Sequence, residues 1–291
     1  MNDLRYIVIS PARNEEAFLP RTIQCMERQT AAPIQWILID DGSTDRSREL
    51  MHAAAQRHQW ITVIHRGDRG FRQAGTGVID AFYDGYAAVV HPDWHYLVKF
   101  DADLSFAPDY FEKCFARFAA DPKLGIGGGT ICNEIRGNLE VESKVDPRFH
   151  VRGATKIYRR ECWEQIGGLI HAPGWDTVDE VKANMLGWVT CTFPDLKLLH
   201  HRMAGGAYGQ WHNWVKGGRA NYVAGYHPLF MFFKCVRRLS TKPYFIGGVG
   251  LWFGFVGSYV KRLPQVPDRE VIRYFRQQQC NRLLGRKSLW S

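Results

Sequence analysis

The chain has 291 residues, of which 45% are hydrophobic and 23% charged, a mixture that is ordinary for a globular protein with a buried core. Its seven scattered cysteines form no C-x-x-C pair, which argues against a disulfide framework or a zinc site and indicates reduced thiols. The net charge of +9 lies in the tail, because residues 234–291 hold twelve Lys and Arg against two acids.

Strand and helix signals alternate along the first part of the chain. Apolar runs rich in β-branched and aromatic residues predict strands at 5–10, 34–43, 60–66 and 95–103. The segments between them predict helices at 14–29, 44–58 and 71–90. This alternation predicts parallel βαβ units and an α/β fold with an open, mostly parallel sheet flanked by helices.

A polar cluster follows each of these strands. In chain order the clusters read SPARNEE, DDGSTD, RGDRGFR and DADLS, and they begin at Ser10, Asp40, Arg66 and Asp101. Ligands of open α/β sheets bind beyond the carboxyl ends of the strands. We therefore expect the four loops to line one crevice.

Two acids, Asp101 and Asp103, leave the fourth strand one residue apart, so the period of two turns both side chains to the same face. Taken alone, the pair has two interpretations. It is either a solvated turn, which Asp, Ser and Pro favour, or a site for Mg²⁺ or Mn²⁺. These cations prefer oxygen ligands and take one or two carboxylates together with substrate phosphates.

Three more segments have readable patterns. The glycine-rich run 125–131 lacks the spacing of a dinucleotide-binding loop and predicts a closely packed strand. Residues 150–169 predict a strand and a short helix closed by Gly167 or Gly168, and residues 191–199 predict another strand.

Four ordered motifs, P-A-R-N-E, D-D-G-S-T-D, F-D-A-D and an acid before Gly-Trp, resemble those of inverting family-2 glycosyltransferases with the GT-A fold. The resemblance covers roughly residues 5–203. It implies one domain over 1–203, with a nucleotide-sugar half at about 1–104 and an acceptor half at about 105–203. It also implies transfer of a sugar from a nucleotide-diphosphate donor with Mn²⁺ or Mg²⁺.

The same resemblance implies roles for individual residues. Asp41 is expected to bond the base, and a carboxylate would suit the N3–H of uracil, although guanine also offers N–H donors. A UDP-sugar is therefore favoured. Asp103 is expected to meet the metal ion, and Asp101 to lie near the ribose or the metal. The expected nucleotide-sugar site as a whole comprises Pro11, Ala12, Arg13, Glu15, Asp41, Arg72, Asp101, Ala102 and Asp103.

The general base is expected to be a carboxylate, because inversion needs a group that takes the acceptor's proton during a single displacement. Asp176 matches the base of the family by its distance from Gly-Trp, and Asp179 is the second choice. Trp175 stands where the family usually has Glu. Thr177 and Glu180 form a capping box, which predicts a helix over residues 181–186 with Asp176 just before it.

A histidine is implied as a third metal ligand, and either His200 or His201 qualifies, with His201 slightly preferred. The metal site is then Asp101, Asp103 and His201. Expected acceptor-binding residues are Arg152, Gly153, Trp175 and Trp211, the last because Trp stacks on sugars or lies at membrane interfaces.

The tail, residues 204–291, is expected to be a C-terminal helical extension that associates with a membrane. Residues 243–260 carry no charge and are flanked by Arg237, Arg238, Lys242, Lys261 and Arg262, which suits anionic lipid headgroups. The alternative is packing against a partner chain, including a homo-oligomer. The apolar run is too continuous for a nucleic-acid surface, so we expect no nucleic-acid partner.

The leading functional hypothesis is an inverting glycosyltransferase with a lipid-linked or polysaccharide acceptor, attached peripherally or monotopically to the cytoplasmic face of a membrane. A nucleotidyltransferase shares the sheet type, but it would need a glycine-rich loop where this chain has SPARNEE. A non-catalytic subunit of a polysaccharide synthesis complex is the third class.

Overall fold

A computed structural model describes residues 4–68, 76–143, 145–202, 209–241 and 243–291. The chain divides into two compact units, the first made of residues 1–169 and 186–202 and the second of 170–185 and 203–291. We expected a continuous domain over 1–203, whereas the structure assigns the segment 170–185 to the second unit.

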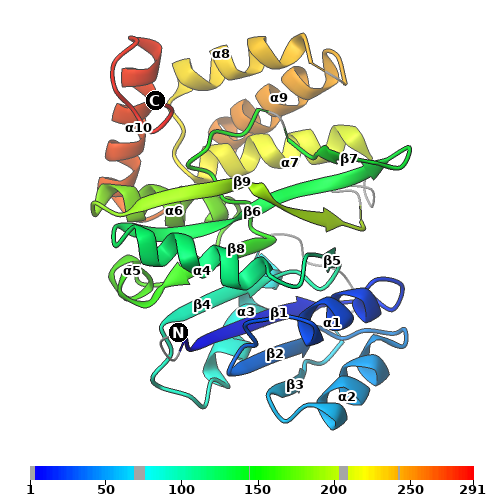
Figure 1. The fold of residues 1–291 in the computed structure, drawn as a ribbon. Coiled ribbons are helices and arrows are strands. Elements are labelled where there is room, and N and C mark those ends of the chain that lie inside the picture. Colours follow the sequence, from blue (N-terminus) through cyan, green and yellow to red (C-terminus); the bar gives the residue numbers. More distant parts are fainter. Residues whose placement is uncertain (1–3, 69–75, 144, 203–208, 242) are drawn as a thin grey trace. The chain divides into compact units, whose positions relative to one another are not determined.

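The first unit contains a sheet with the strand order β3-β2-β1-β4-β8-β6-β9-β5 and with β7 paired to β6 (Figure 1). The predicted strands in the first hundred residues are confirmed. In the described residues the strands are β1 Tyr6–Ala12, β2 Gln35–Asp40, β3 Ile61–His65, β4 Tyr96–Phe100, β5 Leu104–Ser105, β6 Leu124–Ile135, β7 Asn138–Val141, β8 Thr155–Arg159 and β9 Val189–His200.

Helices pack on this sheet and bury one aromatic-rich core, which includes Tyr6, Trp36, Phe100, Phe111 and Phe118. The helix of the segment 14–29 begins later than predicted, where Pro20 occupies the first turn. The described helices of this unit are α1 Leu19–Glu27, α2 Ser47–Arg57, α3 Thr76–Ala87, α4 Tyr110–Ala120 and α5 Arg160–Ile166. Gly167, with φ 73, closes α5 as predicted.

The sheet is mixed, which corrects the expectation of a mostly parallel one. Strands β1 to β4 are parallel to their neighbours among themselves, but β8 runs antiparallel to both β4 and β6. A hairpin joins β6 to β7 through Arg136 and Gly137, whose φ values of 53 and 79 are those of a tight hairpin turn. A two-residue turn can only join antiparallel strands, so the expectation of parallel strands connected by helices does not hold in this part of the sheet.

The glycine cluster of β6 packs as predicted. A Cβ atom on Gly128 would overlap the carbonyl oxygen of Thr155 on β8, and one on Gly129 would overlap that of Leu196 on β9. Glycine therefore lets β6 lie close to both neighbouring segments.

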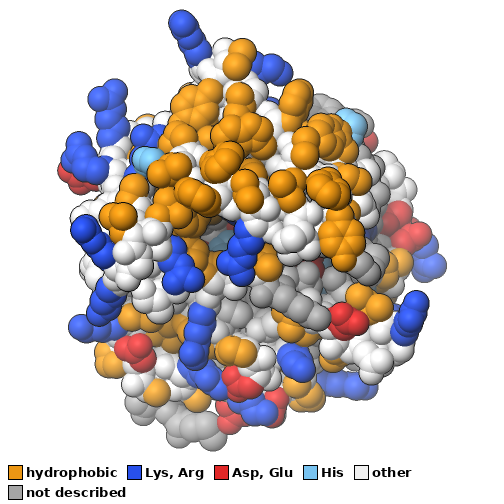
Figure 2. Space-filling view, turned by 90° about the horizontal axis from the view of Figure 1, so that it is seen from above, with side chains coloured by type: hydrophobic (Ala, Val, Ile, Leu, Met, Phe, Trp, Pro, Cys, Tyr) orange, Lys and Arg blue, Asp and Glu red, His pale blue; other side chains and the backbone are white. Residues whose placement is uncertain are grey.

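The second unit is helical. Its described helices are α6 Trp175–Met185, α7 Gln210–Val223, α8 Pro228–Leu239, α9 Ile246–Val260 and α10 Arg269–Leu283. They share a core to which α6 gives Val178 and Val181, and α10 gives Val271 and Phe275. Large apolar side chains also gather on one exposed face of this unit (Figure 2). Among the described residues, none of the helices is both long and apolar enough to cross a bilayer.

Candidate active site

The loops after β1 and β2 are held together by side-chain caps. Asn14, which has a left-handed φ of 54, accepts a hydrogen bond from the amide of Thr44 at 2.8 Å through Oδ1, and its own amide donates to Ser43 Oγ at 3.1 Å. The amide of Glu15 donates to Ser47 Oγ at 2.7 Å. The P-x-x-N-E and D-D-G-S motifs thus form one rigid rim beyond the ends of two neighbouring strands.

Asp41, the expected base-binding residue, lies on this rim between two arginines. Its Oδ1 accepts from Arg66 at 2.7 Å, and its carbonyl oxygen accepts from Arg13 at 2.8 Å. Arg66 also pairs with Asp84 at 2.6 Å, and Arg13 pairs with Asp68 at 2.7 Å. Both arginines therefore contact Asp41 directly, whose contact with a base stays a prediction.

The two acids of the D-x-D motif lie in different surroundings. Asp101 is about one-third exposed and forms an ion pair with Lys99, which is buried in β4. Asp103 is buried, and its Oδ2 lies 3.3 Å from His200 Nε2.

A line of alternating charges continues beyond Asp103. His200 Nδ1 lies 3.9 Å from Glu142, and Glu142 pairs with Arg152 at 3.1 Å. Burial disfavours the charged form of each side chain, but the hydrogen bonds and charge interactions among these side chains favour the charged forms more strongly. They lower the pKa of Asp103 and of Glu142 and raise the pKa of His200 to about 10.

This cluster offers a cation a carboxylate oxygen. Asp103 Oδ1 is buried and accepts no hydrogen bond from the part of the chain that the structure describes, which is costly for a carboxylate. In the same part of the chain, no three His, Cys, Asp or Glu side chains are grouped to hold a metal ion by themselves. The donors fit Mg²⁺ or Mn²⁺, which complete their shells with water and substrate phosphates.

The two histidines after β9 have different neighbours. His201 Nε2 lies 2.7 Å from Ser105 Oγ and its Nδ1 lies 3.2 Å from Arg21, while its ring stacks on Phe18. Burial and the charge of Arg21 lower its pKa. The structure thus places His200, the less preferred of the two candidates, against Asp103, and a metal-binding role for either histidine stays a prediction.

Three predicted site residues of the first unit play structural parts. The side chain of Ala102 lies in the core, and its carbonyl accepts from Thr22 Oγ1 at 2.8 Å. Glu15 is buried and accepts from Arg202 at 2.7 Å. Arg152, expected to bind the acceptor, pairs with Glu142 and lies 3.5 Å from Asp146.

Pro11 and Ala12 end β1, and Gly153 lies just before β8. Arg72 falls outside the described residues.

The candidate bases belong to the second unit. The helix that carries them begins at Trp175, so Asp176 lies inside its first turn and not before it, which corrects the capping-box prediction. Asp176 is partly exposed, whereas Asp179 is 3% exposed and accepts a hydrogen bond from the amide of Glu180 at 2.7 Å. A general base must be within hydrogen-bond reach of the acceptor hydroxyl, so the exposure of Asp176 favours it over the buried Asp179.

Two of the expected acceptor-binding residues lie in the helices of the second unit. Trp175 is buried. Trp211 is 40% exposed in the first turn of α7, with its ring centroid 5.9 Å from that of Phe253 on α9. Their contact with an acceptor stays a prediction.

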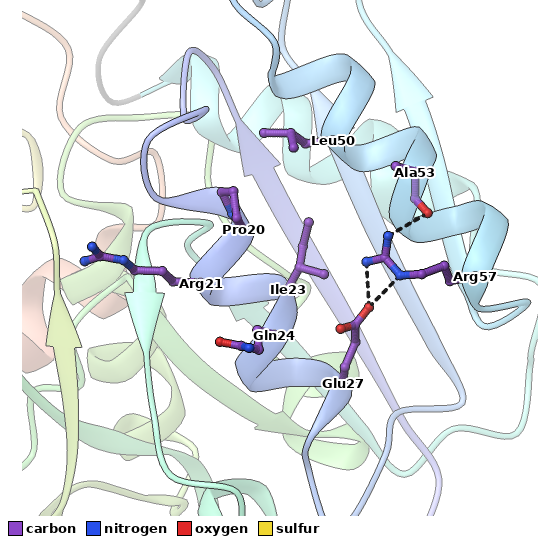
Figure 3. A pocket seen from close by; sticks show the side chains of 8 residues that line it. All are labelled: Pro20, Arg21, Ile23, Gln24, Glu27, Leu50, Ala53 and Arg57. Carbon is purple, nitrogen blue, oxygen red and sulfur yellow. Dashed lines mark hydrogen bonds and ion pairs between the residues drawn. The ribbon is translucent and has the colours of Figure 1, made fainter.

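A cavity of about 400 Å³ between α1 and α2 is separate from these residues (Figure 3). Its lining includes Glu27 and Arg57, which pair with each other at 2.8 Å, and Arg57 also donates to the carbonyl oxygen of Ala53. Apart from Arg21, whose guanidinium lies beside His201, the lining contains no residue of the site described above. We do not assign the donor site to it.

Two residues of the site, Lys99 and Glu142, were missed by sequence reasoning, and Arg66 was expected only as the first residue of a loop that lines the crevice. Lys99 had a readable signal, because a lysine inside an otherwise apolar strand needs a buried acid. Glu142 had none, since it reaches His200 only through the hairpin of β6 and β7.

The chain is similar to known proteins in sequence. The family model described as Glycosyl transferase family 2 matches residues 7–171. The uncharacterized glycosyltransferase EpsJ of Bacillus subtilis (strain 168) is 36% identical over 86 residues, which is 30% of this chain and 25% of that protein. The undecaprenyl-phosphate 4-deoxy-4-formamido-L-arabinose transferase of Pseudomonas paraeruginosa (strain DSM 24068 / PA7) is 31% identical over 115 residues, 38% of this chain and 32% of that protein.

These alignments span a quarter to a third of the relatives' own lengths. In fold, the chain matches the crystal structure of GalNAc-T7 with UDP, GalNAc and Mn²⁺ at a TM-score of 0.63 and 15% identity, over 98% of this chain and 58% of that one. At such low identity the likeness concerns the fold alone, which is α/β of the GT-A type with a mixed sheet.

Proposed function

Because the chain belongs to glycosyl transferase family 2, whose model matches more than half of it, we propose that it moves a sugar from a nucleotide-diphosphate sugar to a lipid-linked or polysaccharide acceptor with inversion. That it is a glycosyltransferase follows from the family. The donor, the acceptor and the stereochemistry are the proposal.

The observation that carries the proposal is the buried Asp103, with one oxygen against His200 and the other accepting no hydrogen bond from the described residues. It lies directly after β4, the neighbour of β1 in the sheet, and β1 and β2 end in the rim that holds Asp41. Asp103, with Asp101 or with His200 after His200 loses its proton, would hold Mn²⁺ or Mg²⁺, which supplies Lewis-acid stabilisation of the departing diphosphate when bound. Asp41, Arg13 and Arg66 would orient the base and the ribose.

We assign the proton transfer to Asp176. An acceptor hydroxyl forms the new C–O bond at the anomeric carbon while the bond to the diphosphate breaks, and the nucleoside diphosphate leaves with the electron pair. The hydroxyl proton passes to the Asp176 carboxylate. The amide of an Asn side chain at this position could not accept that proton.

A UDP-sugar is the favoured donor, because a carboxylate such as Asp41 suits the N3–H of uracil and a protein of like fold binds UDP. A lipid-linked acceptor is supported by one relative, the undecaprenyl-phosphate 4-deoxy-4-formamido-L-arabinose transferase of Pseudomonas paraeruginosa. Such an acceptor would place the reaction at the cytoplasmic face of a membrane.

The test is a screen of nucleotide sugars with Mn²⁺ that records donor hydrolysis and thermal protection of the full chain. We expect one donor to raise the melting temperature only when Mn²⁺ is present, and nucleoside diphosphate to be released. Release of pyrophosphate instead would indicate a nucleotidyltransferase and overturn the proposal.

The matched variant for this screen is Asp103→Asn, which removes the charge of the buried carboxylate but keeps its size. We expect turnover to fall at least about a hundredfold and the Mn²⁺-dependent protection to weaken. Asp109→Asn, at the exposed start of α4, is the control and should behave like the parent chain. Undiminished Mn²⁺-dependent turnover in Asp103→Asn would remove this residue from the metal site.

A further inference from the structure

Helices α8 and α9 and the turn between them expose an unusually large set of bulky apolar side chains, which Figure 2 shows as a crowded orange surface. Single exposed apolar residues are normal, but a contiguous group this large marks an interaction site. We call this group the α8–α9 face. Its members are Leu229, Phe232, Phe233, Val236, Tyr244, Phe245, Ile246, Val249, Trp252, Phe253, Val256, Tyr259 and Val260.

The inner side of α9 shows that this exposure is built into the helix. Gly250 and Gly254 face α7, where a Cβ on Gly254 would overlap the carbonyl oxygen of Val215 and one on Gly250 would lie 2.7 Å from Trp214 Cβ. Val249, Phe253 and Val260 are 50%, 62% and 78% exposed. A helix of a water-soluble surface has the reverse arrangement, with large apolar residues inside and polar ones outside.

Basic residues accompany the face and acids do not. Residues 228–262 contain six Lys and Arg and no Asp or Glu. Arg237, Lys261 and Arg262 are exposed at the ends of α8 and α9, and blue side chains border the orange surface in Figure 2. The face is therefore complementary to a surface that is apolar within and negatively charged at its boundary.

The charge pattern distinguishes between two possible partners of the α8–α9 face, a second copy of the chain and an anionic bilayer. A second copy of this chain docked face to face would bring like charges together, because a twofold interface joins the same patch of each copy. An anionic bilayer places phosphate groups above hydrocarbon and matches both features. Trp252 and Tyr244 suit the boundary between the two layers.

The turn that leads into α9 adds an independent observation. Phe245 is 68% exposed and has φ 62 and ψ −48, and the amide of Ile246 donates to the carbonyl oxygen of Tyr244 at 2.7 Å, so Phe245 is the centre of a γ-turn with a positive φ that is strained for a bulky residue. The strain places a large aromatic ring at the surface of the turn, where water offers it no favourable contact.

We propose that the α8–α9 face docks the chain onto an anionic lipid bilayer, with both helices along the membrane surface and their apolar side chains in the interface. The 15 residues of α9 extend about 22 Å, less than the hydrocarbon thickness of about 30 Å, so the helix lies in the interface. Docking goes beyond the proposed reaction and does not depend on it.

The experiment measures co-sedimentation of the full chain with vesicles of phosphatidylcholine containing phosphatidylglycerol, and with vesicles of phosphatidylcholine alone. We expect binding to the anionic vesicles that weakens with salt. Phe253→Glu should reduce this binding at least about tenfold, since it replaces an exposed phenyl ring that would enter the membrane interface by a charge. Arg237→Ala and Lys261→Ala should each reduce it roughly fivefold.

Leu284→Glu is the matched control, because Leu284 is 64% exposed in the same unit but lies outside the face. Donor hydrolysis without vesicles should persist in Phe253→Glu, so that loss of docking and loss of the reaction are seen separately. Full-length chain that stays in the supernatant at low salt would overturn the proposal. So would equal losses in Phe253→Glu and Leu284→Glu, or a dimer in solution that Phe253→Glu alone converts to a monomer.

Discussion

Asp40 and Asp41 follow one another at the end of β2, and their carboxylates lie in different surroundings. Asp40 is fully buried, accepts from the amide of Ser43 at 2.8 Å, and pairs with Arg48 at 2.8 Å. Asp41 faces the rim and Arg66. The resemblance to the family implies that Asp41 bonds the base, but the sequence does not show what Asp40 does. It could not show that Arg48 neutralises Asp40.

We predict that Asp40→Asn lowers the free energy of unfolding by about 1–3 kcal/mol near neutral pH, since Arg48 and Ser43 lose a charged partner. Burial raises the pKa of Asp40, but its bonds to Ser43 and Arg48 outweigh burial and lower the pKa below 3.8. The stabilisation that ionised Asp40 gives the folded state is therefore present above about pH 4. It is lost as the pH falls through the pKa that Asp40 has in the folded state.

Urea unfolding at about pH 7 and about pH 3 measures this difference. Asp109→Asn, which removes an exposed i,i+4 pair with Lys113, should change stability by less than about 1 kcal/mol at both pH values. If Asp40→Asn lowered the free energy of unfolding equally at low pH, the stabilisation could not come from the charge of Asp40.

Two variants test whether His200 or His201 contributes to the metal site. His200→Asn should weaken Mn²⁺-dependent nucleotide protection by about tenfold or more, because His200 contacts Asp103 directly. His201→Asn should have a smaller effect, because that ring bonds to Ser105 and Arg21. The measurement is the melting temperature against Mn²⁺ concentration with a fixed nucleotide. A larger effect in His201→Asn would restore the preference inferred from sequence.

At the scale of elements, α9 pairs with α7 through glycines. A Cβ on Gly218 of α7 would overlap the carbonyl oxygen of Leu251, and Gly254 meets Val215 in the same way. The sequence shows this as G-L-W-F-G, the small-xxx-small spacing that lets two helix backbones approach closely. Glycine weakens an isolated helix, but of the five glycines in residues 243–260 four lie on the buried side of α9.

We predict that Gly254→Ala destabilises the second unit by about 1–3 kcal/mol, since the backbone of α7 cannot yield cheaply to a methyl group. Gly257→Ala is the matched control in the same helix. A Cβ there meets no atom within 4 Å, so the higher helix propensity of alanine should raise stability by up to about 1 kcal/mol. Thermal unfolding of both variants gives the comparison, and equal stabilities would contradict the packing.

Elements that follow from local patterns could be predicted, and those that depend on distant contacts could not. The strands at 6–12, 35–40, 61–65 and 96–100 follow from their apolar residues. The mixed half of the sheet depends on a two-residue turn at Arg136, which carries no Asn-Gly signal. The helix α6 starts before its predicted cap; Trp175, its first residue, is buried, and Val178 belongs to the core of the second unit.

At the scale of the whole molecule, the tail is more than an appendage for attachment. Its helix α10 contacts α6, and Phe275 is 1% exposed in the same core as Val178 and Val181. The helix that carries Asp176 therefore depends on residues about a hundred positions later in the chain, a pairing that no local pattern reveals. The residues proposed to hold the donor and the metal ion all lie in the first unit.

We predict from this division that Phe275→Ala separates catalysis from donor binding. Removing a buried ring that also lies 4.8 Å from Tyr226 should destabilise the second unit by about 3–5 kcal/mol and lower turnover with it. Mn²⁺-dependent protection by the nucleotide should persist, because its residues belong to the first unit. Gln277→Ala, exposed on the same helix, controls for the substitution itself. Turnover and nucleotide binding are measured on the same samples. A parallel loss of both would mean that donor binding also depends on the folded second unit.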